Sequence, residues 1–418
     1  MSIVVIKHGG LSKAAALRAV SQAAAQRSAT VVVVDDDDDL PWAKTSDPDP
    51  PAFVHVRQLT YAAILQALEN ARIRPTAVFT FMDPAVVLTA RLAQYFQVPR
   101  QSLASLERLK DKLQMREALR AAGFEQPRFA RVTSESDLVA AAQHVGFPLV
   151  LKPATGSAFK LGVVRVDSEA VLLEKFRAAR ATLENSEFSR FLSGGAQPTW
   201  MVESYLAGVE LSVEVRGDLV NPIIVAVHEK TMTESAGLFR EDQFITAPYH
   251  LDAQTLEQVR ADAILAVRAL EFDRGVAHLE MRVSAGRSVP LELQPVPGGG
   301  MVSQLTEWSC GINLHALHAQ ALIDEQPAPL SPGIPSKYCV MDVIYSAAPG
   351  VFDIAGIESA AKSPGILAVQ TPRRHRVRVS QPFSEYLGFI VAQASTSAAA
   401  VQQANDARRK IRIVPSAV

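Results

Sequence analysis

Strand-like and helix-like segments alternate through the first hundred residues, and this alternation limits the folds open to that part of the chain. Short apolar runs predict three strands, at Ile3–Ile6, Thr30–Val34 and Ala77–Phe81. Helical character follows in between, at Leu11–Arg27, Tyr61–Ala71 and Ala85–Phe96. Strands that alternate with helices pair in parallel, because each helix carries the chain back across a face of the sheet. We therefore expect an α/β domain whose parallel sheet is covered by helices.

The composition favours a multidomain protein that acts on small molecules. The chain has 418 residues, of which 48% are hydrophobic and 20% charged, with a formal net charge of -1. This length predicts two to four domains, and the balanced charge argues against nucleic acid or an acidic membrane surface as a partner. No apolar run reaches the length of a membrane span, and Met1–Gly10 lacks the basic segment of a signal peptide. We expect a cytoplasmic protein.

The middle of the chain predicts a different kind of sheet. Leu103–Gly123 is helical in character, and short strands are expected at Met201–Tyr205, Glu210–Val215 and Ile223–Val227, which could form one antiparallel sheet. A helix is expected at Gln254–Ala269 and a hairpin at Gly275–Val283 and Val289–Gln294, around Ala285-Gly286. After a Pro-rich linker, the segment from Lys337 to Val418 predicts a final α+β unit.

Oxygen ligands gather on the predicted hairpin. Glu280 lies on its first strand, and Glu292 and Gln294 lie two residues apart on its second, so these two point to the same face. Mg²⁺ prefers oxygen ligands and is held in proteins by one or two carboxylates together with substrate phosphates. The pattern indicates a magnesium site, and a polar face on an exposed hairpin is the alternative.

Two further segments have residues suited to a nucleotide. Lys152 ends an apolar strand, and the small residues of 153–162 after it would let backbone N–H groups approach phosphate oxygens. The spacing of a Walker A motif is absent, so a plain hairpin turn is the alternative. Glu203 and Glu210 bracket a strand end and could accept hydrogen bonds from an adenine amino group and from ribose hydroxyls. Taken singly, each is an ordinary surface glutamate.

Five segments in this order resemble the ATP-grasp superfamily of carboxylate–amine ligases: Asp111–Arg116, Phe147–Pro153, Val202–Tyr205 with Glu210, His278–Glu280, and Leu291–Gly299. The resemblance covers nearly the whole chain. It implies an α/β and α+β architecture, the ATP-grasp fold, with an N-terminal pre-ATP-grasp domain at 1–103. The ATP-binding subdomain would span 104–206, the metal and substrate subdomain 207–330, and a C-terminal lobe 331–418.

The resemblance also implies roles for single residues, with ATP and Mg²⁺ as cofactors. Two Mg²⁺ ions are expected, with Mn²⁺ as a substitute. Lys112 and Lys152 would contact the ATP phosphates and the adenine edge. The remaining roles are the phosphate-covering lid for Gly156, Ser157 and Lys160, adenine recognition for Glu203 with Tyr205 and Leu206, ribose binding for Glu210, and metal binding for Glu280 and Glu292 with Gln294 where the family usually has Asn.

Within the superfamily, the chain is similar to the L-amino-acid ligases, the bacterial dipeptide synthetases of the bacilysin type. The segment Gly237–Pro248, which follows Val227–Lys230, carries this similarity. It implies that Glu241 holds the ammonium group of an amino-acid substrate, whereas a charged loop beside a strand is the alternative reading. The implied product is a dipeptide, formed through an acyl phosphate, with antibiotic biosynthesis as a possible setting. The family resemblance also implies a homodimer.

One position departs from the family pattern. The family usually has Arg four residues after the second metal-binding Glu, where it clamps the substrate carboxylate or acyl phosphate, and this chain has Val296 there. Arg282, Arg240 or Lys230 could supply the charge instead, and we expect Lys230, Glu241 and Arg282 to act in catalysis. Two alternative functions remain open: a ligase of primary metabolism, of the purine or carboxylase type, and an ATP-binding relative without catalysis.

Overall fold

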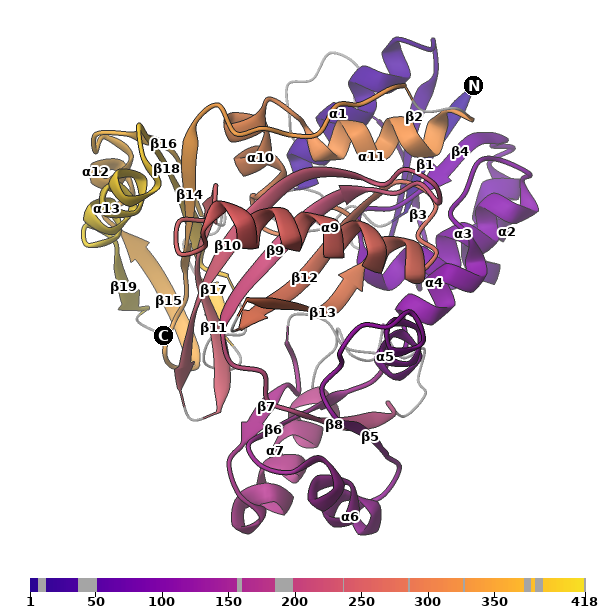
Figure 1. Cartoon of the computed structure of the whole chain (residues 1–418). Coiled ribbons are helices and arrows are strands. Elements are labelled where there is room, and N and C mark those ends of the chain that lie inside the picture. The colour runs from indigo at the N-terminus through magenta and orange to yellow at the C-terminus, as the bar shows by residue number, and fades with distance from the viewer. Residues whose placement is uncertain are drawn as a thin grey trace.

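The computed structural model describes residues 1–6, 13–36, 51–155, 160–184, 198–235, 237–284, 286–325, 328–371, 377–379 and 386–416. Within these ranges the chain forms an N-terminal body, a small lobe, a central body and a C-terminal lobe, and the last two share one long sheet (Figure 1). Gly156 and Ser157, which were expected in the lid, lie outside the described residues.

The N-terminal body contains the predicted parallel sheet. Its elements are β1 Ser2–Ile6, α1 Lys13–Ala25, β2 Thr30–Asp35, β3 Ala52–His55, α2 Tyr61–Asn70, β4 Pro75–Phe79, the short 3-10 helix η1 Asp83–Ala85 and α3 Val86–Tyr95. The strands pair in parallel in the order β3-β2-β1-β4, which confirms the expectation. Strand β3 was not predicted. Alternate residues of β1 face opposite layers: Ile3 and Val5 pack toward α1, whereas Val4 and Ile6 pack toward α2 and α3.

The predicted helix at 103–123 is two helices, α4 Leu103–Leu109 and α5 Lys112–Ala121. The break has a local cause. The Asp111 side chain accepts hydrogen bonds from the backbone N–H groups of Leu113 and Gln114 and so caps the start of α5. This cap places Lys112, which is buried, at the first position of α5.

A small lobe follows, drawn in purple at the bottom of Figure 1. Its elements are β5 Phe129–Val132, α6 Glu135–Val145, β6 Leu149–Pro153, β7 Val164–Val166, the 3-10 helix η2 Glu169–Val171, α7 Leu172–Glu184 and β8 Trp200–Ser204. The four strands form an antiparallel sheet in the order β5-β8-β6-β7. The helices α6 and α7 pack on one face of this sheet, in a core that includes Leu138, Phe176 and Trp200.

The central body and the C-terminal lobe share one eight-stranded sheet, in the order β13-β12-β9-β10-β11-β14-β18-β16. The elements of the central body are β9 Val209–Arg216, β10 Ile223–Ser235, β11 Leu238–Thr246, α9 Ala253–Ala269, β12 Val276–Ser284, β13 Arg287–Gln294, α10 Val302–Cys310 and α11 Leu314–Ile323. Helix α9 covers one face of this sheet and packs on Leu211, Val213 and Val215 of β9 (Figure 1). The opposite face packs in part against α10, through Val225, Phe244 and Val276, and carries buried polar side chains over the rest.

The C-terminal lobe continues this sheet and adds a three-stranded one, β17-β15-β19. Its elements are β14 Tyr338–Ile344, β15 Gly350–Ala355, α12 Ile357–Ala361, β16 Ile366–Gln370, β17 Val377–Val379, β18 Gly388–Ala394, α13 Ser397–Arg408 and β19 Arg412–Pro415. The mixture of strands and helices agrees with the α+β unit expected there. No helix in the described part of the chain has the length and apolar character to span a membrane.

One predicted grouping of strands is wrong. Met201–Tyr205 was expected to join the strands at 210–215 and 223–227, but β8 pairs with β5 and β6 in the small lobe. The chain leaves that lobe at Gly208, which has φ +122° and lies so close to Val283 that a Cβ would be 2.1 Å from its carbonyl oxygen. Closeness in sequence therefore did not decide pairing, because this tight crossing moves the chain into a different sheet.

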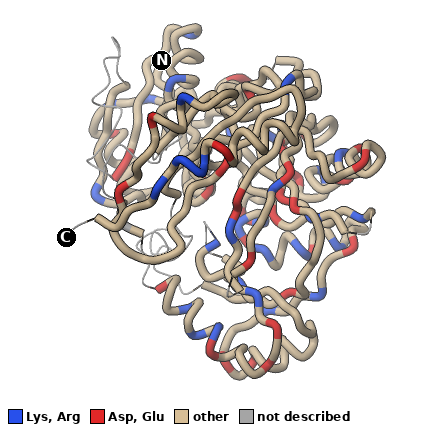
Figure 2. Tube along the Cα trace, turned by 90° about the vertical axis from the view of Figure 1, so that its left-hand side faces the viewer, with Lys and Arg blue, Asp and Glu red and all other residues tan. Residues whose placement is uncertain are grey.

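The predicted hairpin is confirmed, and the segment 237–248 is found to be mostly a strand. Strands β12 and β13 pair antiparallel across residues 276–294. The segment 237–248 forms strand β11, paired with β10 on one side and β14 on the other, and is therefore not a charged loop. Figure 2 shows Lys and Arg interspersed with Asp and Glu along the trace, as expected from the balanced net charge.

Candidate functional site

Three glutamates surround one lysine on the polar face of the central sheet. Lys230 of β10 lies opposite Glu210 of β9 in the strand register, and its Nζ is 2.9 Å from a Glu210 oxygen. The same Nζ is 2.7 Å from Glu241 of β11 and 2.6 Å from Glu280 of β12. The Lys230 side chain is fully buried, with 0% exposure. Four adjacent strands thus place one ammonium group at the centre of three carboxylates, which we name the glutamate cluster.

The charges of the glutamate cluster hold one another in place. Burial alone raises the pKa of Glu241, but the ammonium groups of Lys160 and Lys230 outweigh it, and the pKa falls to about 2. The pKa of Glu280 is likewise well below its usual range, because Lys230 and His278 outweigh the effect of burial. Burial lowers the pKa of Lys230, and the three carboxylates reverse this and hold it well above its usual value. At neutral pH all four groups are therefore ionised.

The glutamate cluster has the donor set of a divalent cation site. One carboxylate oxygen from each glutamate lies within 4.8 Å of the others. Glu292 of β13 lies directly opposite Glu280 in the hairpin register, so it can add a fourth carboxylate beside them. Oxygen ligands from carboxylates are what Mg²⁺ prefers. Gln294 lies opposite His278 and is half-buried.

Lys112 connects the hairpin to helix α5. Its Nζ is 2.9 Å from Glu292, and its side chain is 10% exposed. Burial lowers the pKa of Lys112, but Glu292 and, more weakly, Asp83 and Glu203 outweigh it, so the pKa lies above its usual value. Lys112 is thus a buried cation between the hairpin and the small lobe.

A second buried ion cluster lies at the small lobe, where two cations form ion pairs with Glu203. Lys152 of β6 donates to one Glu203 oxygen at 2.5 Å, and Arg116 of α5 donates to the other at 3.0 Å. Burial raises the pKa of Glu203, but Arg116 and Lys152 outweigh it and lower the pKa to about 2. Lys152 behaves differently, because its burial outweighs Glu203 and lowers its pKa. Both Glu203 oxygens orient cations in this structure.

Arg116 is a residue of this cluster that the sequence reasoning missed. Its side chain is fully buried, with 0% exposure, and its Nη2 has no hydrogen-bond partner. It also donates to the backbone oxygen of Pro290 at 2.6 Å, so it joins α5 to the hairpin. The sequence did contain a signal for Arg116. The segment Asp111–Arg116 was singled out by its resemblance to the family, but a role was assigned only to Lys112.

The small lobe touches the central sheet through a few charged contacts. Lys160, which follows the part of the expected lid that is not described, lies 2.8 Å from Glu241. Arg165 of β7 pairs with Glu234 at 2.8 Å and lies 4.3 Å from the centre of the Tyr205 ring. The first contact joins the segment before β7 to β11, and the second joins β7 to the end of β10. The lobe and the glutamate cluster are therefore held together across the site.

Arg282 and the strand exit at 205–206 form one edge of the site. Arg282 of β12 pairs with Glu210 and donates to the backbone oxygen of Leu206 at 2.7 Å. Its Nε is buried without a hydrogen-bond partner. Tyr205 donates its hydroxyl to Glu234 at 2.5 Å. Glu210 therefore shares its two oxygens between Lys230 and Arg282.

His278 and Glu214 form a buried pair that was not assigned from sequence. His278 bonds Glu214 through Nδ1, and its Nε2 is 3.8 Å from Glu280. The backbone N–H of Gly298 donates to the other Glu214 oxygen at 3.2 Å. Burial lowers the pKa of His278, but Glu214 outweighs it and raises the pKa to about 10. His278 is a cation beside the glutamate cluster, and only its place in His278–Glu280 hinted at this.

The structure separates the three candidates for the missing arginine. Val296 is 4% exposed and packs against Val86, Ala90 and Leu106 of the N-terminal body, so this position does not face the glutamate cluster. Arg240 bonds Asp242 and Thr233 instead. Of the residues considered, Arg282 and Lys230 lie within the site.

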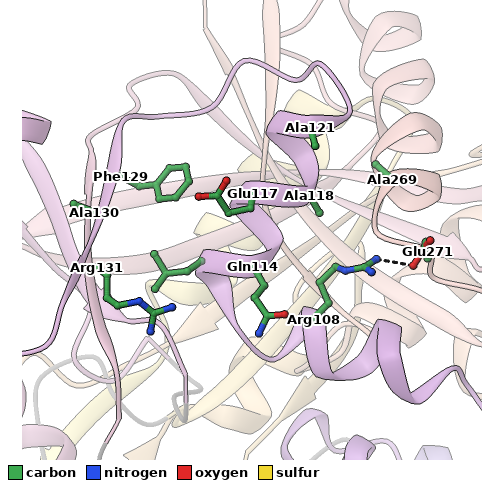
Figure 3. Close-up of a pocket in the computed structure, with 11 residues that line it drawn as sticks. Arg108, Gln114, Glu117, Ala118, Ala121, Phe129, Ala130, Arg131, Ala269 and Glu271 are labelled. Atoms are coloured by element: carbon green, nitrogen blue, oxygen red, sulfur yellow. Dashed lines mark hydrogen bonds and ion pairs between the residues drawn. The ribbon is translucent and has the colours of Figure 1, made fainter.

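A broad open hollow of about 720 Å³ lies outside this site, between α5 and β5 (Figure 3). Gln114 and Glu117 of α5 border it, and an ion pair joins Arg108 to Glu271 at 2.7 Å along its edge. None of the residues in the glutamate cluster borders this hollow. We place the candidate site at the glutamate cluster, where three carboxylates meet a buried lysine, and not at this hollow.

Family models match two parts of the chain. An ATP-grasp domain matches residues 145–305, and the L-amino acid ligase C-terminal domain 2 matches residues 343–415. The first match contains the small-lobe strands β6–β8 and all of the glutamate cluster. The second covers most of the C-terminal lobe.

Similar proteins agree with these matches. The chain is 33% identical over 193 residues to a D-alanine–D-alanine ligase of Stutzerimonas stutzeri, covering 45% of this chain and 55% of that ligase. It is 26% identical over 318 residues to an uncharacterised protein of Sinorhizobium fredii, covering 74% of this chain and 62% of that protein. The chain thus spans less than two thirds of the length of these curated relatives. A crystal structure of an L-amino acid ligase from Bacillus licheniformis superposes with a TM-score of 0.83 at 21% identity, covering 100% of this chain and 99% of that one, which shows a shared fold.

Proposed function

We propose that this chain, which belongs to the ATP-grasp ligases, joins two L-amino acids into a dipeptide at the expense of ATP. One observation carries the proposal. Tyr386, in the part of the chain that matches the L-amino acid ligase domain, donates its hydroxyl to Glu241 of the glutamate cluster at 3.4 Å. The domain that distinguishes these ligases therefore contacts the carboxylate expected to hold the substrate ammonium group.

The cations around the site are suited to a triphosphate. Lys112, Lys152 and Lys160 are the proposed phosphate ligands. Among the described residues, neither the buried Nη2 of Arg116 nor the buried Nε of Arg282 has a hydrogen-bond partner, so each can donate to a phosphate oxygen. A phosphoryl transfer needs mainly positioning and charge neutralisation, because the protein takes part in little covalent chemistry.

The carboxylates fit a divalent cation, as the family implies. Glu280 and Glu292, opposite each other in the hairpin, would hold it, with Glu210 and Glu241 within reach of the same position. When bound, Mg²⁺ would neutralise charge on the phosphate groups. Lys230 offsets part of the negative charge of the three glutamates in this structure, and a bound cation would offset more of it. Two ions, and Mn²⁺ as a substitute, stay predictions.

The proposed reaction has two steps. A carboxylate oxygen of the first amino acid attacks the γ-phosphorus of ATP, which forms an acyl phosphate and releases ADP. The amino group of the second amino acid then attacks the acyl carbon, loses a proton, and displaces phosphate. Glu241 would orient an ammonium group, and contact of Lys160 with phosphate instead of Glu241 would free this carboxylate for it. Closure of the small lobe would keep water from the acyl phosphate.

Phosphate release from ATP tests this proposal. The full chain is assayed with MgCl₂ and all pairs of the twenty L-amino acids, with D-amino acids in parallel, and products are identified by mass spectrometry. We expect release that depends on both amino acids and a dipeptide product of L configuration. No release with any pair would reject the proposal, and ATP binding without release would identify a non-catalytic relative. Release only with D-alanine would point to the chemistry of the Stutzerimonas relative.

Glu241→Gln tests the assigned role. Loss of a charge-assisted hydrogen bond of about 1.5–3 kcal/mol predicts a KM for one amino acid that rises about 10- to 100-fold, while the KM for ATP changes less. Glu257→Gln is a matched control, because Glu257 is exposed on α9 and pairs only within that helix, with Arg260. A KM for both amino acids equal to that of the control would remove Glu241 from the site. Homodimerisation and a cytoplasmic location stay predictions of the family resemblance.

A further inference from the structure

A separate polar cavity of about 350 Å³ lies at the junction of the central body and the C-terminal lobe. Strand β11 contributes Arg240, Asp242 and Gln243, β14 contributes Asp342, and α13 contributes Asn405 and Arg408. No member of the glutamate cluster borders this cavity. Glu241 contacts Lys230 and Lys160, whereas Asp242 bonds Arg240 and Gln243 bonds Asp342. The register of β11 shifts between Glu241 and Gln243, and this shift interrupts the regular alternation of side chains along the strand.

A buried carboxylate with one unused oxygen borders the cavity. Asp342 is 6% exposed. Its Oδ2 accepts a hydrogen bond from Gln243 at 2.9 Å, but its Oδ1 has no hydrogen-bond partner among the described residues. Oδ1 forms a long ion pair with Arg408, whose Nε is 3.7 Å away, beyond hydrogen-bond length. Burial raises the pKa of Asp342 to about 6, as expected for a carboxylate that lacks donors.

Gln243 cannot satisfy the free oxygen. Its Nε2 already donates to Asp342 Oδ2 and to Asn405 at 2.8 Å, so both of its hydrogens are used. The amide also fixes the Asp342 carboxylate between β11 and α13. A buried polar oxygen without a donor is costly, and a donor from within the cavity would remove that cost.

The charges around the cavity match a zwitterion. Asp342 offers an acceptor for an ammonium group. Arg408, whose side chain is 32% exposed, offers donors for a carboxylate close by. Arg240 and Asp242 pair with each other at 2.5 Å and add no net charge. A volume of about 350 Å³ is in the lower range of small-molecule sites and accommodates a free amino acid.

The cavity also has a short physical link to the glutamate cluster. The register between β10 and β11 shifts next to Thr231 and Met232, so β11 has an irregularity at Glu241 and Asp242, between the two sites. Tyr345 borders the cavity, and its ring centre is 5.3 Å from that of Tyr386, which donates to Glu241. A ligand beside Asp342 therefore lies one layer of side chains from the catalytic carboxylate.

We propose that this cavity is a second binding site for a free α-amino acid, distinct from the catalytic site, in which Asp342 binds the ammonium group and Arg408 the carboxylate. The site is a property of the protein without ATP, so it stands or falls separately from the proposed ligase reaction.

Isothermal titration calorimetry without nucleotide tests this site. The full chain is titrated with each of the twenty L-amino acids, and the best ligand is then titrated into variants. We expect binding that survives Glu241→Gln and weakens at least about tenfold in Asp342→Asn, because the amide cannot attract an ammonium group and loses an ionic hydrogen bond. Asp406→Asn is the matched control, since Asp406 is a half-exposed carboxylate on the same helix α13 as Arg408. Its affinity should equal that of the wild type.

Arg408→Gln keeps the test decisive if Asp342→Asn does not fold. Arg408 is partly exposed, so its replacement is tolerated more easily, and we expect it to weaken the same ligand by at least about tenfold. Absence of binding by any amino acid would overturn the proposal, as would equal affinity in the wild type, Asp342→Asn and Arg408→Gln. Binding abolished by Glu241→Gln alone would assign the ligand to the catalytic site and would also overturn it. The ligase reaction is tested separately, by phosphate release, so this outcome would leave the proposed function standing.

Discussion

Replacement of Glu203 by Gln isolates the buried ion cluster of the small lobe. The Glu203 side chain is 7% exposed, and its pKa falls from 4.5 to about 2 on folding because Arg116 and Lys152 outweigh burial. Each unit of difference between the folded and unfolded pKa corresponds to about 1.4 kcal/mol of free energy of unfolding. The carboxylate therefore contributes about 3 kcal/mol to the free energy of unfolding at pH 7, and Glu203→Gln should lose about that amount.

The sign of the pH dependence follows from the depressed pKa. The contribution of Glu203 is complete above pH 4.5, its unfolded value, and disappears as the pH falls through about 2, its folded value. At pH 3.5 the unfolded carboxylate is mostly protonated and the folded one is not. The difference between the wild type and Glu203→Gln should therefore shrink to about 2 kcal/mol at pH 3.5.

Urea unfolding at pH 7 and at pH 3.5 measures this difference, with tryptophan fluorescence as the signal. Trp200 is a local reporter, because it is buried on β8, the strand that carries Glu203. Glu117→Gln is the control, since Glu117 is half-exposed on α5 and pairs with Arg120 at the surface, where an ion pair contributes about 0–1 kcal/mol.

Two results would refute this reasoning. A loss in Glu203→Gln no larger than in Glu117→Gln would mean that the cations do not depend on the Glu203 carboxylate. A difference that is equal at both pH values would mean that the loss arises from packing and not from ionisation.

We also expect Glu203→Gln to raise the KM for ATP, because Lys152 loses the partner that orients it.

Two further substitutions test the catalytic face. Lys230→Met leaves three buried carboxylates without their central cation and should cost about 3–5 kcal/mol of unfolding free energy. Millimolar MgCl₂ should restore part of this stability in thermal melts, and a melting temperature of the variant that does not rise with MgCl₂ would contradict the cation site. Gly298→Ala would place a Cβ 2.6 Å from His278 Nδ1 and 2.9 Å from Glu214, so the pair must move. The kcat should fall by up to about a hundredfold, whereas Gly299→Ala, whose Cβ meets nothing within 4 Å, should keep it; equal values would exclude a role for the pair.

Much of the fold could be predicted because its signals are local. The short apolar runs such as Ile3–Ile6 and the helical segments between them were enough to indicate a parallel sheet. The turn signal at Ala285-Gly286 between two strand-like segments was enough to indicate the hairpin that pairs Glu280 with Glu292. The failure at Met201–Tyr205 has the opposite cause, since pairing there depends on a crossing at Gly208 that no short window of sequence reveals.

The candidate site divides in the same way. The sequence by itself determined which residue types were present and in what order, and this sufficed to single out Lys152, Glu203, Glu241 and Glu280. It could not say that both Glu203 oxygens orient cations, that Lys230 lies at the centre of three glutamates, or that Val296 faces the N-terminal body. Those facts required the tertiary structure, because the strength and direction of a charge interaction depend on distance and burial. Strand pairing sets both between residues that are far apart in the chain.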